Sequence, residues 1–226
     1  MDSIPNRIPT RIARQALADA QTLYHRGYEV LSRAGETGRF YPPSDPWGWQ
    51  MVDLGVLGHL HDSRISGADG IDGFVTVNVS PETLCGNSAW DMWFGGLQRL
   101  LDARPNLYLG AEVSERCIGM CPKLLDRRIR SLHECGMLVA LDDLVENDPD
   151  LMIGLYFRHA WDIVKIDYRP ATRGPNRRID DLIAGCHERG IPCIVEGIEN
   201  GDDIAQARAW GADMIQGFGI HRPALV

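Results

Sequence analysis

The chain has 226 residues, of which 44% are hydrophobic and 24% charged, a composition that suits one large α/β domain or two small ones. Its formal net charge of −8 argues against duplex nucleic acid as a partner, whereas a small phosphate ligand is compatible if a local cation cancels the repulsion. No apolar run approaches the roughly 18 residues that a membrane span requires. We therefore expect a cytoplasmic protein without a membrane span, folded as a single domain over residues 1–226.

The six cysteines form no CxxC pair, and most lie inside apolar stretches. This pattern favours free thiols over a disulfide framework. Cys117 and Cys121 are four residues apart, but a zinc site would need two further ligands. His59 and His61 are two apart and cannot share one helix face, so we interpret them as surface or packing residues.

The N-terminal part of the chain is ambiguous in its local pattern. Residues 1–10 are polar and contain proline, which indicates a loosely ordered lead-in. The Ala, Leu and Gln content of residues 11–33 favours a helix, although two strand-like runs flank His25-Arg26-Gly27. Residues 34–45 are rich in Gly and Pro and predict a loop, and the apolar spacing of residues 46–63 predicts a helix.

Downstream, short apolar runs alternate with segments of helical periodicity. The expected strands are residues 74–79, 107–113, 137–141, 162–166, 192–195 and 214–215. The expected helices are residues 90–103, 122–135, 150–159, 179–189 and 201–210, with a Pro/Gly/Arg loop at 169–178. Regular alternation of this kind predicts a parallel sheet. With two strands added from the N-terminal segment, the count reaches about eight, which suits a closed barrel.

Polar side chains fall at or near the C-terminal ends of these strands. They are Asn78, Glu112, Asp142, Asp143, Lys165, Asp167, Glu196 and Gln216. In a TIM-type barrel such positions converge at one mouth, where catalytic groups lie. One such residue alone can be a loop cap, but six strands that end in this way predict an α/β fold of the TIM-like (β/α)8 class with a functional site.

So many carboxylates in one cavity would have to be protonated unless cations neutralise them. Oxygen ligands favour Mg²⁺ or Mn²⁺, and the absence of histidine at these strand ends argues against zinc. Two such ions bridged by one carboxylate activate water and stabilise the oxygens of a phosphodiester. A nearby lysine can hold that water or neutralise developing charge. The residues therefore indicate a metal-dependent hydrolase that acts on a phosphate ester.

The order and spacing of several motifs resemble the EAL domain, the family that hydrolyses the bacterial messenger cyclic di-GMP. The resemblance covers residues 13–223. Its signature appears as Glu29-Val30-Leu31, followed by Arg33. The other matching segments are Arg14-Gln15-Ala16-Leu17, Val77-Asn78-Val79-Ser80-Pro81, Glu112-Val113-Ser114-Glu115, Asp142-Asp143, Lys165-Ile166-Asp167, Glu196-Gly197-Ile198-Glu199, Gln216-Gly217-Phe218 and Arg222-Pro223.

The resemblance implies a barrel whose first strand is antiparallel, with strands at residues 12–17 and 24–31 in place of a helix. It implies hydrolysis of cyclic di-GMP to linear pGpG with two Mg²⁺ or Mn²⁺ ions. The implied metal ligands are Glu29, Asn78, Glu112, Asp142, Asp143 and Asp167, with Asp142 bridging the ions and Asp167 or Glu196 supporting the second. The implied catalytic residues are Lys165, Glu196, Glu29 and Gln216, and the implied substrate-binding residues are Gln15, Arg33 and Glu199.

The sequence also departs from the family pattern. Val30 replaces an alanine and Ala16 a proline, both small changes. In the family, a Gly-rich loop follows the position of Asp143 and communicates with the dimer interface, and the residue at the position of Glu115 steadies that loop. In this chain residues 144–150 read LVENDPD instead. This difference supports the alternative of a catalytically impaired domain that binds cyclic di-GMP or a regulatory protein partner. A homodimer is compatible with both readings, and an unrelated metal-dependent barrel hydrolase is the third hypothesis.

Overall fold

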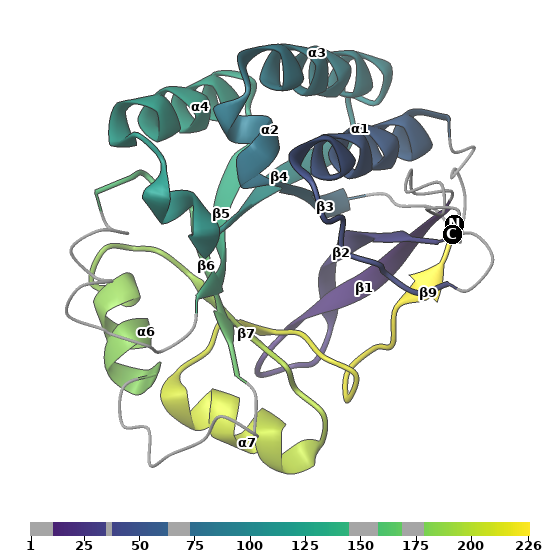
Figure 1. Ribbon diagram of the computed structural model, residues 1–226. Coiled ribbons are helices and arrows are strands. Elements are labelled where there is room, and N and C mark those ends of the chain that lie inside the picture. The colour runs from purple at the N-terminus through teal and green to yellow at the C-terminus, as the bar shows by residue number, and fades with distance from the viewer. Residues whose placement is uncertain (1–10, 35–37, 63–72, 145–157, 169–178) are drawn as a thin grey trace.

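The computed structural model describes residues 11–34, 38–62, 73–144, 158–168 and 179–226. Helices surround a central barrel of strands (Figure 1). The expected helix at 150–159 falls largely outside the described residues, as do the loop at 169–178, the lead-in at 1–10 and residues 145–150 of the altered loop. Within the described part of the chain, no helix is long and apolar enough to cross a membrane.

In the described part of the chain, eight strands close the barrel, and a short ninth strand pairs with the first half of the first strand. The strands are β1 (Arg11–Asp19), β2 (His25–Arg33), β3 (Gly73–Val79), β4 (Leu107–Ser114), β5 (Leu138–Leu144), β6 (Ile163–Asp167), β7 (Cys193–Glu196), β8 (Met214–Ile215) and β9 (Ala224–Leu225). Neighbours from β2 to β8 pair in parallel. Strand β1 is antiparallel to both β2 and β8 and so closes the ring. The predicted TIM-like barrel with an antiparallel first strand is therefore confirmed.

The described helices cover the outside of the barrel. They are α1 (Pro46–Asp62), α2 (Pro81–Cys85), α3 (Asn87–Ala103), α4 (Pro122–Glu134), α6 (Ile179–His187) and α7 (Gly201–Trp210), with a 3₁₀ turn η1 (Glu115–Gly119). Local sequence explains several of their ends. For example, Asn200 caps the first turn of α7 in a capping box with Asp203, and Gly211 ends that helix in the left-handed region.

The helix that propensity favours over residues 11–33 is wrong, because β1 and β2 occupy this segment as an antiparallel pair. Alanine and leucine in β1 are buried between the barrel interior and the surrounding helices, and this burial outweighs their intrinsic preference. The strand-like runs around His25-Arg26-Gly27 were the correct signal. Gln15 pairs with Glu29 in this register, which places a predicted substrate residue beside the signature glutamate.

Side chains alternate along each strand between the barrel interior and the helix layer. The outward residues join one large core with the helices, of which Val75, Val139 and Val195 are examples. A small inner cluster, made of Leu17, Ala140, Ile163 and Ile194, fills the barrel with Phe74 and Met214 packed against it. Two residues further along β6 and β7, the inward positions become Lys165 and Glu196. The barrel is therefore apolar at its base and charged at its mouth.

Candidate active site

A buried lysine lies at the centre of the charged mouth. The Lys165 side chain is 1% exposed. Its Nζ lies 2.7 Å from Glu112 Oε2, 2.9 Å from Asp142 Oδ1, 2.9 Å from Glu196 Oε1 and 3.4 Å from Glu29 Oε2. Burial alone would lower the pKa of Lys165, but these four carboxylates outweigh it and raise the pKa well above its usual value. The four carboxylates therefore favour the charged ammonium form of Lys165.

One ammonium group cannot neutralise four carboxylates. Burial raises the pKa of Glu196 to about 8 although Lys165 opposes the shift, and burial together with Glu29 raises that of Glu112 well above its usual range. Burial, together with the negative charges of Glu29 and Asp143, raises the pKa of Asp142 to about 6. Carboxylates with such pKa values gain strongly from additional cations, because a bound cation removes the cost of their ionisation.

The signature glutamate is held by two amides from distant strands. Asn78 Nδ2, near the end of β3, donates to Glu29 Oε1 at 2.7 Å. Gln216 Nε2, directly after β8, donates to Glu29 Oε2 at 2.6 Å. Both donations favour the ionised carboxylate, and with Lys165 they lower the pKa of Glu29 despite its burial. Glu29 is therefore held in one orientation and favoured in its ionised form, which suits a carboxylate ligand of a divalent cation.

An irregularity in β5 brings both aspartates to the same cavity. Adjacent residues of a regular strand point to opposite faces, so Asp142 and Asp143 would normally diverge. Here the pairing with β6 shifts register between Leu141 and Leu144, and Asp143 has a φ of 56°, in the left-handed region. Both side chains consequently line the cavity at the mouth.

The donor set fits divalent cations with oxygen ligands. Carboxylate oxygens of Asp142, Asp143 and Glu196 all lie within 4.8 Å of one another. Among the described residues, Glu112 Oε1 and Gln216 Oε1 are buried and accept no hydrogen bond. Buried acceptors without partners are costly, and a cation would satisfy them. Glu196, rather than Asp167, groups with the aspartate pair, although Asp167 also lines the cavity.

The cavity beside these carboxylates has a volume of about 770 Å³, which is in the range of small-molecule sites. All three residues predicted to bind substrate, namely Gln15, Arg33 and Glu199, line it. Gln15 Nε2 donates to the carbonyl oxygen of His221 at 3.3 Å, and this hydrogen bond orients the Gln15 amide. Arg33 Nη1 donates to the carbonyl oxygen of Ser32 at 2.7 Å.

Sequence reasoning missed several residues of the cavity wall. Phe40, Trp49 and Arg116 line it, with the Arg116 guanidinium 5.4 Å from the centre of the Trp49 ring. These residues lie in a loop, a helix and a 3₁₀ turn, so the strand-end rule cannot find them. An aromatic ring beside a guanidinium offers a stacking surface for a planar group.

A buried aspartate on α1 supports the end of β3. Asp53 Oδ2 accepts hydrogen bonds from Ser80 N at 3.0 Å, Ser80 Oγ at 2.6 Å and Thr83 Oγ1 at 2.5 Å. Burial raises the pKa of Asp53 to about 6, although these hydrogen bonds oppose the shift. The signal in the sequence was a single acid inside the apolar run of α1. Asp53 thereby anchors the segment that follows Asn78.

Comparison with known families decides the relationship of the chain. The sequence profile described as EAL domain matches residues 55–223. The chain belongs to the EAL domain family. The matched segment does not reach Glu29, so the place of the signature in this EAL domain rests on the barrel geometry. A search of curated proteins finds no significant match.

Solved structures share this fold at low sequence identity. PaMucR phosphodiesterase in complex with c-di-GMP has a TM-score of 0.76 and 20% identity, over 95% of this chain and 96% of that one. An EAL domain protein of Listeria monocytogenes EGD-e has a TM-score of 0.72 and 21% identity, over 96% and 90%. Klebsiella pneumoniae BlrP1, in a complex with calcium and cy-diGMP, has a TM-score of 0.73 and 19% identity, over 96% of this chain. The chain spans 56% of the length of BlrP1.

Proposed function

We propose that this EAL domain is a metal-dependent phosphodiesterase that hydrolyses cyclic di-GMP to linear pGpG. The observation that carries the proposal is the group of four carboxylates around Lys165, with the aspartate pair beside it, at the wall of a cavity of about 770 Å³. Membership in the family supports the reaction class, and structures of relatives in complex with c-di-GMP support the substrate.

The residues at the mouth divide into two ligand sets for Mg²⁺ or Mn²⁺. Glu29, Asn78, Glu112 and Asp142 would hold one ion, and Asp142 and Asp143 the other, supported by Glu196, which groups with the aspartate pair, or by Asp167 at the cavity wall. Structures of BlrP1 in complex with calcium or manganese are consistent with cations of this class. When bound, two such cations lower the pKa of a water molecule and neutralise charge on the phosphodiester.

The protein's own groups then orient, bind and move protons. Lys165, held by four carboxylates, presents a fixed ammonium group that orients the attacking water and offsets negative charge. Glu196, which lines the same cavity 2.9 Å from Lys165 Nζ, would accept the proton of that water once bound cations keep its carboxylate ionised. Gln216 keeps Glu29 in position through its hydrogen bond. Arg33 and Gln15 would hold the substrate, and Glu199, which lines the same cavity, would position the site.

The test is incubation of the purified chain with cyclic di-GMP and Mg²⁺ or Mn²⁺, with pGpG measured by chromatography. Glu29→Gln should reduce turnover at least 100-fold, because it removes a charged ligand that two amides hold in place. Glu134→Gln, an exposed change on α4, is the matched control and should leave turnover unchanged. Absence of pGpG from the wild-type chain with either ion would refute the proposal.

The altered segment at residues 144–150 favours one second candidate, a domain that binds cyclic di-GMP without hydrolysing it. Equilibrium binding of labelled cyclic di-GMP in the presence of Ca²⁺ separates the two functions. Binding that Arg33→Ala weakens, in the absence of turnover with Mg²⁺ or Mn²⁺, would favour the second candidate. If neither binding nor turnover occurs, a regulatory protein partner becomes the ligand to seek.

A further inference from the structure

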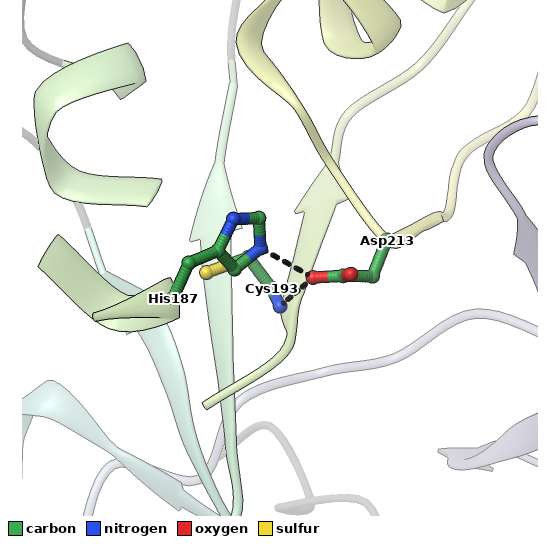
Figure 2. Close-up of side chains that lie close together, drawn as sticks. All are labelled: His187, Cys193 and Asp213. Carbon is green, nitrogen blue, oxygen red and sulfur yellow. Dashed lines mark hydrogen bonds and ion pairs between the residues drawn. The ribbon is translucent and has the colours of Figure 1, made fainter. Parts of the chain in front are cut away.

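A second cluster of metal-binding side chains lies at the other end of the barrel. His187 is the last residue of α6, Cys193 is the first residue of β7, and Asp213 directly precedes β8. In Figure 2 the His187 ring and the Cys193 backbone N–H both face the Asp213 carboxylate, and the Cys193 sulfur lies on the side of the imidazole ring away from Asp213 in this view. Strands begin at this end of a parallel barrel, whereas the proposed active site lies where they finish. The two sites are therefore separated by the apolar base of the barrel.

The three donor atoms are already close together. The His187 nitrogen, the Cys193 sulfur and an Asp213 carboxylate oxygen all lie within 4.8 Å of one another. His187 Nε2 is 2.9 Å from Asp213 Oδ2, and the same oxygen accepts a hydrogen bond from the Cys193 backbone N–H at 2.7 Å. Two ligands of a tetrahedral zinc ion are about 3.3–3.7 Å apart, so a small movement of His187 makes room for an ion.

A similar histidine–aspartate contact elsewhere in the barrel shows which part of this cluster is unusual. His133 and Asp162 form an equivalent pair at 2.8 Å, and Asp162 Oδ2 accepts the Val139 backbone N–H at 2.7 Å. The histidine–aspartate–amide contact therefore recurs where a helix, a loop and a strand meet, and it fixes the start of the strand in both places. In the His187 cluster the residue that donates its backbone N–H is Cys193, which carries a thiol. In the His133 pair the corresponding residue is Val139.

We propose that His187, Cys193 and Asp213 bind a divalent transition metal of the zinc class. His Nε2, Cys sulfur and a carboxylate oxygen are the ligand types of protein zinc sites, and water completes the tetrahedron. The His187 and Asp213 side chains are each 41% exposed, so the ion enters from solvent, and the fully buried Cys193 forms the floor. The Cys193 thiol donates its proton to the sulfur of Cys186, and a bound ion would displace that proton from the Cys193 sulfur.

The two ends of the barrel then select different metals. The mouth offers oxygen ligands, which suit Mg²⁺ and Mn²⁺, whereas a thiolate and an imidazole favour Zn²⁺ or Co²⁺. Binding releases the thiol proton to water and links α6, β7 and the segment before β8. The ion is therefore expected to stabilise the fold without taking part in phosphodiester hydrolysis.

Cobalt titration tests the site directly, because only a thiolate ligand gives an intense near-ultraviolet charge-transfer band with Co²⁺. The titration uses the Cys85→Ser/Cys121→Ser protein, which removes two exposed thiols, and contains saturating Mg²⁺ to occupy the mouth. We expect one equivalent of Co²⁺ to produce the band, and His187→Gln to weaken Co²⁺ binding at least ten-fold. His133→Gln is the matched control and should leave the titration unchanged.

Unfolding measurements provide an independent readout. Zn²⁺ in the presence of Mg²⁺ should raise the midpoint of thermal unfolding of the wild-type protein, and Asp213→Asn should abolish this shift. Absence of the charge-transfer band, or a band that persists in Cys193→Ser, would overturn the proposal. If Cys193→Ser fails to fold, an unchanged Co²⁺ affinity in His187→Gln is the result that overturns it.

Discussion

Lys165→Met tests the electrostatic core of the proposed site. The change keeps the length of the side chain but removes the cation 2.7–3.4 Å from four carboxylates. Removal of one partner from a buried ion pair costs about 3–5 kcal/mol, because the remaining charge stays desolvated. With EDTA at pH 8 we expect a loss of this size in the free energy of unfolding. At lower pH the loss should shrink as the carboxylates take up protons.

Divalent cations should partly restore the stability of this variant. A ligand that binds only the folded state at 100 times its Kd contributes about 2.7 kcal/mol. Without the competing ammonium group, the mouth should bind Mg²⁺ more tightly, so Mg²⁺ should stabilise Lys165→Met more than the wild-type protein. Turnover should nevertheless fall about 10²–10⁴-fold, since the water loses its orienting group.

Urea unfolding followed by circular dichroism, with EDTA or with Mg²⁺, measures both effects. The other lysine of the chain, Lys123, is exposed on α4, and Lys123→Met is the control that should leave stability unchanged. A loss below about 1 kcal/mol with EDTA, or an equal effect of Mg²⁺ on the variant and the wild-type protein, would refute the idea that Lys165 acts as an internal counter-ion.

Three further predictions concern the supports of the site. Because burial raises the pKa of Asp53 from 3.8 to about 6, the folded state holds this proton more tightly, and stability should fall by roughly 3 kcal/mol as pH rises from about 4 to 6. Asp53→Asn should flatten that slope in urea unfolding, and an unchanged slope would contradict the assignment. Gln216→Leu removes the 2.6 Å hydrogen bond to Glu29 and should raise the Mg²⁺ concentration for half-maximal turnover about 10–100-fold, whereas an unaltered requirement would remove Gln216 from a positioning role. Gly197→Ala places a Cβ 2.4 Å from a backbone oxygen at a φ of 75°. It should lower the free energy of unfolding by about 1–3 kcal/mol more than Gly136→Ala, where φ is 77° and no atom lies within 4 Å of the added Cβ. Equal losses of stability in the two variants would show that the contact relaxes.

The sequence predicted most of the barrel because strands buried on both faces leave a plain pattern. Apolar runs that end in a polar residue marked β3 to β8, and the order of these residues indicated where they meet. Local propensity failed at β1, where long-range pairing with β2 and β8 determines the structure. The two residues of β9 were too few to give a pattern.

The site was predicted in its strand-borne residues and missed elsewhere. The pair Asp142-Asp143 was visible, but the register shift that brings both to the cavity has no local signal. Helix α2 was not predicted, although Ser80 followed by Pro81 is typical of a helix start, because proline is favoured in the first turn. The cluster of Cys193 and His187 has no motif spacing, since its members meet only through the packing of helix, strand and loop.

The left-handed conformation of Asp143 lowers the stability of the fold at a residue on which the proposed activity depends. A side chain at a φ of 56° carries a steric cost of order 1 kcal/mol, which glycine would not. Replacement by glycine would also remove one negative charge from a crowded cluster. Selection for thermal stability alone would therefore favour loss of this carboxylate and of the proposed hydrolysis with it. Directed evolution of a more stable barrel should therefore select for turnover in parallel, because selection for stability alone would remove a carboxylate on which the proposed hydrolysis depends.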